Sequence, residues 1–167
     1  MKTVVCPGSF DPITNGHMDI IQRASGIFDR VIVLVAANQE KRGFFTPPER
    51  VEMIRRVVAE AGLQNVTVDS DNGLLVNYIQ RVGACAIVKG LRAVSDFEQE
   101  VQMAVINRHL NPRLETMFLA SSEKYTYLSS TIVKEMARYG ANLAEFVPWE
   151  IVDDVNRRMR EMEGKEG

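Results

Sequence analysis

The residues best suited to chemistry follow a short apolar run, "TVVC", at 3–6. The next segment, "PGSFDPITNGH" (7–17), combines hydroxyls, a carboxylate and a histidine with two glycines. His17 comes directly after Gly16, where a helical pattern begins, so its side chain can reach a group bound at that helix N-terminus. This arrangement favours binding of a phosphate. A structural role is the alternative for His17, and it is the favoured interpretation for the other histidine, His109.

Cations and hydroxyls recur directly after the other apolar runs. Lys41 and Arg42 follow the second run, although a solvated loop pair is an alternative for both. The later runs are followed by Lys89, Gly90, Arg92, Ser121, Ser122 and Lys124, and then by the helix start at Ser129, Ser130 and Thr131. If these runs are strands of one parallel sheet, their carboxyl ends meet at one edge. The sequence therefore predicts a phosphate-binding edge.

Apolar runs alternate along the chain with segments of helical periodicity, and this alternation indicates such a sheet. Strands are expected at 3–6, 31–37, 65–70, 84–90 and 114–120. Helices are expected at 16–28, 46–62, 74–83, 95–110, 129–140 and 148–162, before a frayed tail at 163–167. Capping boxes are expected at Thr46 with Glu49 and at Ser95 with Glu98. The pattern predicts an α/β fold in a single domain over 1–167: a doubly wound, five-stranded parallel sheet of Rossmann-like type with a C-terminal helix.

Composition and charge restrict the possible partners. The chain has 20 basic and 22 acidic residues and a net charge of −2, which argues against a nucleic-acid-binding protein. The longest apolar run, 31–37, is far too short to cross a membrane, and the N-terminus does not resemble a signal peptide. A soluble, cytoplasmic protein without membrane or nucleic-acid partners is expected. Cys6 and Cys85 are both expected to be small buried hydrophobes.

Several motifs together resemble one enzyme family. "TNGH" (14–17) resembles the (T/H)xGH signature of the nucleotidyltransferase superfamily, and "LSST" (128–131) resembles its second, Ser/Thr-rich signature. The longer strings "PGSFDPITNGH", "KGLRAVSDFEQE", "NRHL" and "YTYLSSTIVKE" resemble the bacterial phosphopantetheine adenylyltransferases, over nearly the whole chain. "GLRAVSDFE" (90–98) makes the resemblance specific, because TxGH alone indicates only the superfamily.

The resemblance implies the penultimate step of coenzyme A synthesis. ATP and 4'-phosphopantetheine would give dephospho-coenzyme A and pyrophosphate by direct in-line attack, without a covalent intermediate. Mg²⁺ would come with ATP, and no metal site on the protein is expected. The resemblance further implies a homohexamer, with dephospho-coenzyme A and coenzyme A as product or feedback ligands. Closure of the loop at 38–46 over the phosphates is a further hypothesis.

The resemblance also implies roles for individual residues. The catalytic residues would be His17, Lys41 and Arg92. ATP would be bound by Ser9, Phe10, His17, Gly90, Leu91, Arg92, Glu100, Tyr125, Thr126, Tyr127, Leu128, Ser129, Ser130 and Thr131. The second substrate would be bound by Ser9, Lys41, Leu75 and Lys89, although many family members have Arg in place of Lys89. Two alternatives are structural: Glu100 could be a helix-surface acid, and Asp11 is expected to cap the turn at 14–16.

Other functions remain open at this stage. The nearest is a nucleotidyltransferase with another acceptor, joining ATP to nicotinate mononucleotide, or CTP to glycerol phosphate or choline phosphate. A second is a non-catalytic module that senses ATP or coenzyme A. A third, an RNA-binding fragment related to aminoacyl-tRNA synthetases, conflicts with the acidic pI of about 5.8 and the short chain.

Overall fold

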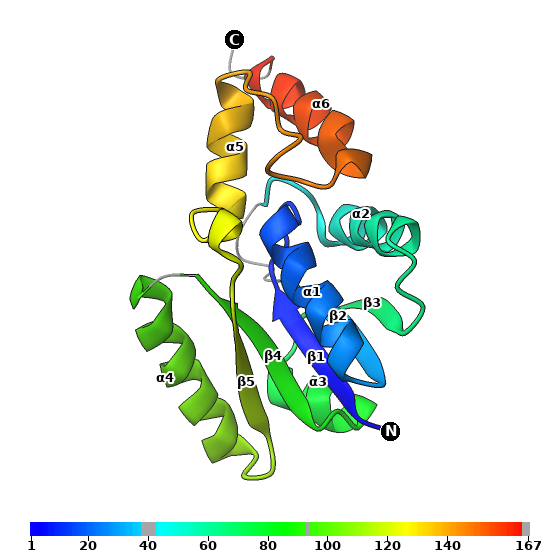
Figure 1. The fold of residues 1–167 in the computed structure, drawn as a ribbon, viewed down its shortest axis with the longest axis vertical. Coiled ribbons are helices and arrows are strands. Elements are labelled where there is room, and N and C mark those ends of the chain that lie inside the picture. Colours follow the sequence, from blue (N-terminus) through cyan, green and yellow to red (C-terminus); the bar gives the residue numbers. More distant parts are fainter. Residues whose placement is uncertain (38–42, 93, 165–167) are drawn as a thin grey trace.

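The computed structural model describes residues 1–37, 43–92 and 94–164, so Lys41 lies outside the described residues. Within these residues, strands and helices alternate along the chain (Figure 1). The strands are β1 (Thr3–Gly8), β2 (Arg30–Ala36), β3 (Val66–Asp71), β4 (Ala86–Leu91) and β5 (Glu115–Ala120). The helices are α1 (Asn15–Ile27), α2 (Pro47–Glu60), α3 (Leu75–Val82), α4 (Val94–Leu110), α5 (Ser130–Arg138) and α6 (Val152–Glu163), with 3₁₀ turns η1 (Glu123–Tyr125) and η2 (Trp149–Ile151).

The strands form one parallel sheet in the order β3-β2-β1-β4-β5. β1 lies in the middle, with β2 on one side and β4 on the other. It joins β4 through the pairs Val4–Ala86 and Val5–Ile87. The winding of the chain reverses at this junction, and in such sheets a crevice opens there at the carboxyl ends of the strands. The predicted doubly wound, Rossmann-like fold is confirmed.

Successive strand residues enter two hydrophobic clusters, one on each face of the sheet. In β2, Val31, Val33 and Val35 belong to one cluster, whereas Ile32 and Leu34 belong to the other. Side chains of α1, α2, α5 and α6 complete the first cluster, and side chains of α3 complete the second. Because both faces of β2 are covered, its sequence is a continuous apolar run, as expected of a buried parallel strand.

Two helices begin directly after a Ser or Thr cap residue, as the sequence predicts, and one helix does not. At α2, the Thr46 hydroxyl accepts from the Glu49 amide, and the Glu49 carboxylate accepts from the Thr46 amide, as predicted. At α5, the Ser129 hydroxyl accepts from the amide of Ile132 at 3.2 Å. α4 begins at Val94, so Ser95 is the second residue of the helix, and the predicted cap position is wrong by two residues.

The C-terminal region also differs in detail from the prediction. The expected helix at 148–162 is divided into the turn η2 and the helix α6, which continues to Glu163. The predicted tail therefore starts one residue too early, and 165–167 lie outside the described residues.

The prediction that both cysteines are buried is wrong for one of them. Cys6 is buried within β1, but Cys85 is exposed. The reason is that β4 begins only at Ala86, so Cys85 lies just before the strand, where its Sγ donates to the Thr3 carbonyl at 3.3 Å.

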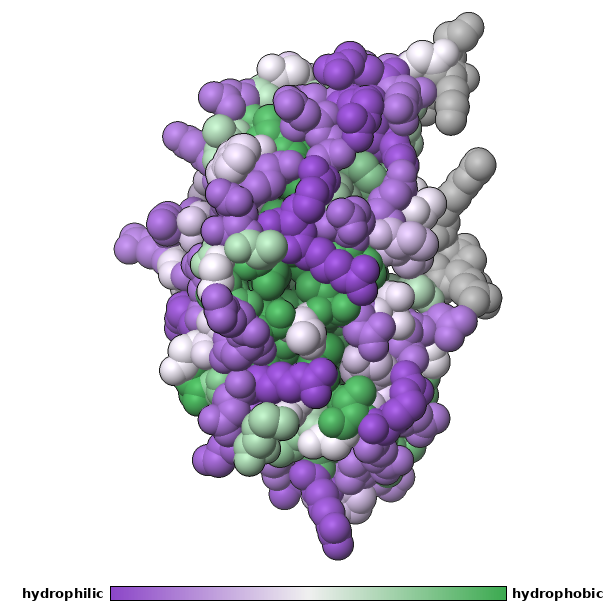
Figure 2. All heavy atoms as spheres, turned by 90° about the vertical axis from the view of Figure 1, so that its right-hand side faces the viewer, coloured by the Kyte–Doolittle hydropathy of each residue, from purple (hydrophilic) through white to green (hydrophobic). Residues whose placement is uncertain are grey.

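The face of the molecule on the side of α2 is largely hydrophilic, with a hydrophobic hollow near its centre (Figure 2). Among the described residues, none of the helices combines the length and apolarity needed to cross a bilayer.

Candidate active site

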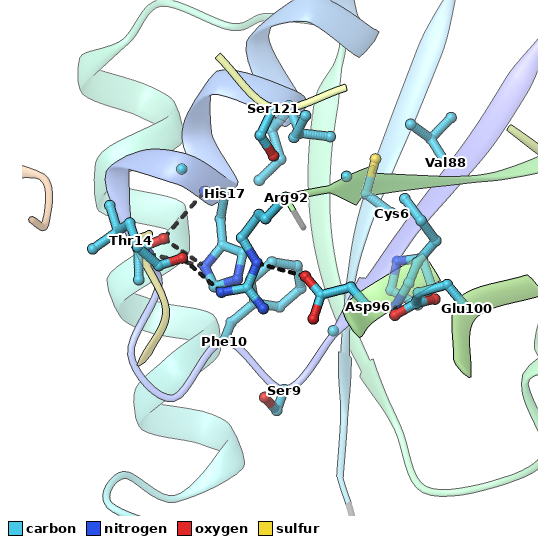
Figure 3. A pocket seen from close by; sticks show the side chains of 18 residues that line it. Cys6, Ser9, Phe10, Thr14, His17, Val88, Arg92, Asp96, Glu100 and Ser121 are labelled. Carbon is cyan, nitrogen blue, oxygen red and sulfur yellow. Dashed lines mark hydrogen bonds and ion pairs between the residues drawn. The ribbon is translucent and has the colours of Figure 1, made fainter. Parts of the chain in front are cut away.

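A cavity of about 230 Å³ lies where the carboxyl ends of β1 and β4 meet the start of α1 (Figure 3). Its walls come from β1 and the following loop, from α1, from β4 and the start of α4, and from the segment after β5. The lining residues are Cys6, Pro7, Gly8, Ser9, Phe10, Thr14, Gly16, His17, Ile20, Ile21, Val88, Lys89, Gly90, Arg92, Asp96, Glu100, Ser121 and Leu128. This is the position at which a doubly wound sheet binds its ligand.

His17 is held by the cap of α1. Thr14 is the N-cap residue, and its hydroxyl accepts from the His17 amide at 3.2 Å. In return, the His17 ring nitrogen Nδ1 accepts from the Thr14 amide at 3.0 Å. Because Nδ1 is an acceptor, the proton of the neutral ring is on Nε2. The TxGH motif therefore produces a histidine in a defined tautomer, with Nε2–H as its donor.

The surroundings of His17 keep the ring neutral. Burial, and then the positive charges of Arg92 and Lys89, lower the pKa of His17 to about 4. Desolvation and like charge both penalise the imidazolium. At neutral pH the ring is therefore a hydrogen-bond donor without a net charge.

Acid should destabilise the fold through this histidine. The pKa of His17 is about 4 in the folded chain and near 6.5 when unperturbed, so between these values the unfolded chain binds more protons. We expect the free energy of unfolding to fall by up to about 3 kcal/mol from pH 6.5 to pH 4 on this account. Urea unfolding across this pH range should show a smaller decline for His17→Gln than for the wild type. The same decline in the wild type and in His17→Gln would show that His17 is not the cause. His109→Gln is the control and should behave as the wild type.

Phe10 gives the cavity part of its wall. It adopts φ 47°, in the left-handed region that bulky residues rarely enter, which costs about 1–3 kcal/mol. Its ring is buried and meets the His17 ring edge-on, with centroids 5.0 Å apart. The backbone conformation of Phe10 thus places its ring against one side of the His17 ring.

Arg92 joins three elements at the mouth of the cavity. It follows β4, and its Nε lies 3.1 Å from the Asp96 carboxylate in α4. It also donates to the carbonyl of Leu128 at 2.6 Å, just before α5. Figure 3 shows Arg92 and Asp96 together in the cavity lining with His17. Within the part of the chain that the structure describes, these two acceptors orient the guanidinium at the cavity, where a guanidinium can bind an anion.

Lys89 and Glu100 form the second ion pair of the cavity lining. The Lys89 ammonium lies 3.3 Å from the Glu100 carboxylate, and both side chains are partly exposed. The next residue, Gly90, lets α1 approach β4 closely, since an added Cβ would lie 2.8 Å from the Ile20 side chain. The cavity thus presents two cations, each with an acidic neighbour, to an incoming phosphate.

The cavity carboxylates do not make a metal site by themselves. Asp96 and Glu100 each pair with a cation. Throughout the described part of the chain, no three His, Cys, Asp or Glu side chains are grouped so that they could hold a metal ion.

Comparisons with known proteins place this chain in a family. The sequence profile of the Cytidylyltransferase-like family matches residues 5–136. A phosphopantetheine adenylyltransferase of Clostridium botulinum (strain Alaska E43 / Type E3) is 50% identical over 160 residues, which cover 96% of this chain and 99% of that protein. The chain belongs to the Cytidylyltransferase-like family, and within it to the phosphopantetheine adenylyltransferases. A protein of the same name from Streptomyces coelicolor is 51% identical, with coverage of 96% and 99%.

Solved structures support the fold. The bifunctional NMN adenylyltransferase/ADP ribose pyrophosphatase from Francisella tularensis has a TM-score of 0.74 and 14% identity, over 95% of this chain and 50% of that one. The Plasmodium falciparum nicotinic acid mononucleotide adenylyltransferase has a TM-score of 0.67 and 11% identity, over 97% and 96%. Identities this low establish the shared fold alone.

The structure brings many of the predicted site residues together. Those that line the cavity are Ser9, Phe10, His17, Lys89, Gly90, Arg92, Glu100 and Leu128. Leu91 ends β4 beside them. Lys41 lies outside the described residues, as does most of the hypothetical closing loop.

Other predicted residues lie away from the cavity lining. Ser129, Ser130 and Thr131 start α5, where the Ser130 hydroxyl donates to the Pro12 carbonyl at 2.7 Å. Thr126 and the half-exposed Tyr127 follow η1, and Tyr125 lies against Gly16. Leu75 packs against the hydrophobic cluster on the α3 face. The roles of these residues in binding stay predictions.

Sequence reasoning missed several residues of the site. Asp96 lines the cavity and orients Arg92, and its spacing of four residues from Arg92 is the signal that could have identified it. Ser121 is one of the hydroxyls predicted at the phosphate-binding edge and lines the cavity, although the family resemblance gives it no individual role. Cys6 lines the cavity too, and burial raises the pKa of its thiol, which makes it an apolar part of the wall.

The expected role of Asp11 is structural, but its partners differ from the prediction. Its carboxylate accepts from the amides of Phe44 and Phe45 instead of capping the turn at 14–16. The cap of that helix is Thr14, so Asp11 is free to reach a segment more than thirty residues away.

Proposed function

We propose that this chain transfers AMP from ATP to 4'-phosphopantetheine, giving dephospho-coenzyme A and pyrophosphate. The observation that carries the proposal is the meeting of neutral His17 with Lys89 and Arg92 in one cavity at the sheet junction. The acceptor is supported by the names of relatives that are about half identical over nearly the whole chain. The cytoplasmic location expected from the sequence is part of this proposal.

The proposed reaction needs positioning and charge stabilisation more than proton transfer. A phosphate oxygen of 4'-phosphopantetheine forms a bond to the α-phosphorus of ATP, and the bond from that phosphorus to the bridging oxygen breaks as pyrophosphate leaves. The nucleophile is already an anion, so no general base is required. His17 Nε2–H donates to an α-phosphate oxygen in the transition state, while Arg92 and Lys89 offset the growing negative charge.

The remaining assignments follow the family pattern. ATP contacts are assigned to Ser9, Phe10, Gly90, Leu91, Arg92, Glu100 and residues 125–131. Contacts to the second substrate are assigned to Ser9, Lys41, Leu75 and Lys89. Glu100 gains a second role from its pairing with Lys89, since it can hold the ammonium in the cavity wall. Dephospho-coenzyme A and coenzyme A are the expected product and feedback ligands.

Mg²⁺ belongs to the proposal as part of the substrate. ATP carries the ion on its phosphates, and Mg²⁺ usually keeps several waters, so few protein ligands are needed. Asp96 and Glu100 remain counterions of Arg92 and Lys89 in this proposal.

Two replacements of Lys89 distinguish the effect of its positive charge from the effect of its side-chain shape. We expect Lys89→Arg to keep kcat/KM for pyrophosphate release within a few-fold, because the positive charge and a partner for Glu100 both remain. Lys89→Ala should lower it about 10²-fold, because a charge-stabilising donor is lost. Steady-state kinetics with both substrates make the comparison. A fully active Lys89→Ala enzyme would remove Lys89 from the site.

A homohexamer also belongs to the proposal, and exposed apolar side chains of α4 and β5 support it. These are Phe97, Met103, Val105, Ile106 and Leu110 in α4, and Met117 in β5, all between 43% and 63% exposed. Such a concentration is typical of a surface that another subunit covers.

Loss of this apolar surface should change the assembly. We expect Val105→Asp to shift the protein from a hexamer to smaller species, because a carboxylate would then have to be buried between subunits. Light scattering after gel filtration measures the mass. Met162→Asp, at an exposed position of α6, is the control and should keep the wild-type mass. An unchanged hexamer in Val105→Asp would place the interface elsewhere.

The deciding experiment is pyrophosphate release from the purified chain with a panel of acceptors. The acceptors are 4'-phosphopantetheine and nicotinate mononucleotide with Mg²⁺-ATP, and glycerol phosphate with CTP. Release with 4'-phosphopantetheine alone is the expected result. Release with a different acceptor would keep the mechanism and overturn the substrate. ATP binding without release from any acceptor would favour a sensor of ATP or coenzyme A.

A further inference from the structure

A buried ion pair lies behind the cavity, between the loop after β1 and the segment that leads into α2. The Asp11 carboxylate accepts from the Phe44 amide at 2.8 Å through Oδ2 and from the Phe45 amide at 2.7 Å through Oδ1. Asp11 and its partner Arg50 are both more than nine-tenths buried. Neither residue lines the cavity or has a role in the proposed reaction.

Arg50 completes the connection from the other side. It lies in the first turns of α2, and its Nε is 3.3 Å from Asp11 Oδ1 and donates to the Phe45 carbonyl at 2.8 Å. Its NH1 donates to the carbonyl of Ser9 at 3.2 Å. We name this group, Asp11 and Arg50 with the backbone of Ser9, Phe44 and Phe45, the Asp11–Arg50 clasp. It ties together segments that are more than thirty residues apart.

The clasp holds the residues on either side of Phe10. Arg50 donates a hydrogen bond to the carbonyl of Ser9, the residue before Phe10. Asp11 is the residue after Phe10, and the hydrogen bonds to its own carboxylate hold it in place. Phe10 has the left-handed φ of 47°, and its ring meets the His17 ring. A bulky residue keeps such a conformation only where its surroundings over-determine it. The clasp supplies that restraint.

α6 supports the far end of the clasp. The Arg158 guanidinium donates to the Phe44 carbonyl at 2.7 Å and lies over the Phe45 ring at 4.9 Å. The same guanidinium pairs with Glu49, in the turn that carries Arg50. Phe44 and Phe45, whose amides donate to the Asp11 carboxylate, are therefore held in place by α6.

We propose that Asp11 and Arg50 are positioning residues for the reaction: they hold Ser9 and Phe10, and through the Phe10 ring His17, in the geometry that the cavity requires. This inference rests on the proposed function. Buried ion pairs often add little stability over apolar residues of similar size, whereas their directional hydrogen bonds fix geometry. Small displacements of a catalytic group can cost about 10²-fold in rate, so a rigid support has a kinetic effect.

The test compares conservative changes in the clasp with a matched arginine elsewhere in α2. Arg50→Lys keeps the charge but cannot reproduce the fork to Ser9 and Phe45, and Asp11→Asn removes the charge but keeps one acceptor. Arg56→Lys is the control, since Arg56 pairs with Asp154 at a more exposed site. We measure kcat and KM for pyrophosphate release, thermal unfolding, and ¹⁵N spectra of the imidazoles.

The expected result is a fall in kcat of about 10–100-fold in both clasp variants, with KM for ATP changed less, at temperatures where the proteins are folded. The chain has two histidines, so His109 is an internal reference in the spectra. The His17 signals should shift in the clasp variants, the His109 signals should stay, and Arg56→Lys should resemble the wild type.

Three results would overturn the proposal. The first is a folded Arg50→Lys enzyme with wild-type kcat and unchanged His17 signals. The second is failure of both clasp variants to fold, which would assign the clasp to stability alone. The third is an equal effect of Arg56→Lys. A wild-type chain that releases no pyrophosphate would instead be a failure of the proposed function. The His17 spectra with and without Mg²⁺-ATP would still report whether the clasp positions the ring.

Discussion

His17→Ala should lower kcat for pyrophosphate release about 10²–10³-fold, the cost of removing one preorganised donor to a developing charge. The Nε2–H donor is lost, and the Thr14 amide loses its acceptor, Nδ1. Binding of ATP should weaken much less, because Lys89, Arg92 and the start of α1 remain. The measurement is steady-state release with 4'-phosphopantetheine, together with ATP affinity by calorimetry.

The chain offers a matched control for this result. His109→Ala removes an exposed histidine of α4 and should leave kcat at the wild-type level. A His17→Ala enzyme within a few-fold of wild type would end the transition-state role of His17. Weaker ATP affinity with an unchanged kcat would instead make His17 a ground-state binding residue.

The second large effect is expected on the stability of the fold, for a substitution at Gly43. Gly43→Ala should lower the free energy of unfolding by about 3 kcal/mol or more, the range for disruption of a buried charge pair. An added Cβ would lie 1.9 Å from Arg50 NH2, 2.8 Å from the Phe45 carbonyl and 2.9 Å from Asp11 Oδ2. Two of these contacts belong to the ion pair of the clasp and the third to backbone, so the clasp must open to admit the methyl group.

Urea unfolding with Gly26→Ala as the control checks this prediction. Gly26 lies in α1 with nothing within 4 Å of an added Cβ, so alanine there should raise stability by about 0.5–1 kcal/mol through its helix propensity. Gly43→Ala with wild-type stability would show that the segment before α2 can move away from Arg50. The pair of variants thus separates the local clash from a general effect of alanine.

The elements and their order could be predicted from the sequence because their signals are local. β2 appears as a β-branched run, since it is buried on both faces, and α2 appears from its capping box. The small misses have local causes too. Ser95 has the composition of a cap but is the second residue of α4, and Cys85 stands in an apolar run that becomes a strand only at the next residue.

The site could be predicted only where a motif carries its own geometry. Thr14 and His17 are three residues apart, so the cap and the tautomer are both encoded locally. The clasp joins Asp11 to residues 33 and 34 positions later, and no local pattern specifies that contact. Long-range contacts of this kind depend on the packing of the whole sheet.

The central place of β1 has a consequence for how the protein is made. β2 follows β1 closely along the chain, but the other neighbour of β1, β4, starts only at Ala86. Until then one edge of β1 stays unpaired in a nascent chain, and such edges invite association between chains. The cavity needs residues from both sides of this junction, so it is among the last features to form. A chain cut short before β4 would have His17 but would lack the cavity walls that come from Lys89, Gly90 and Arg92.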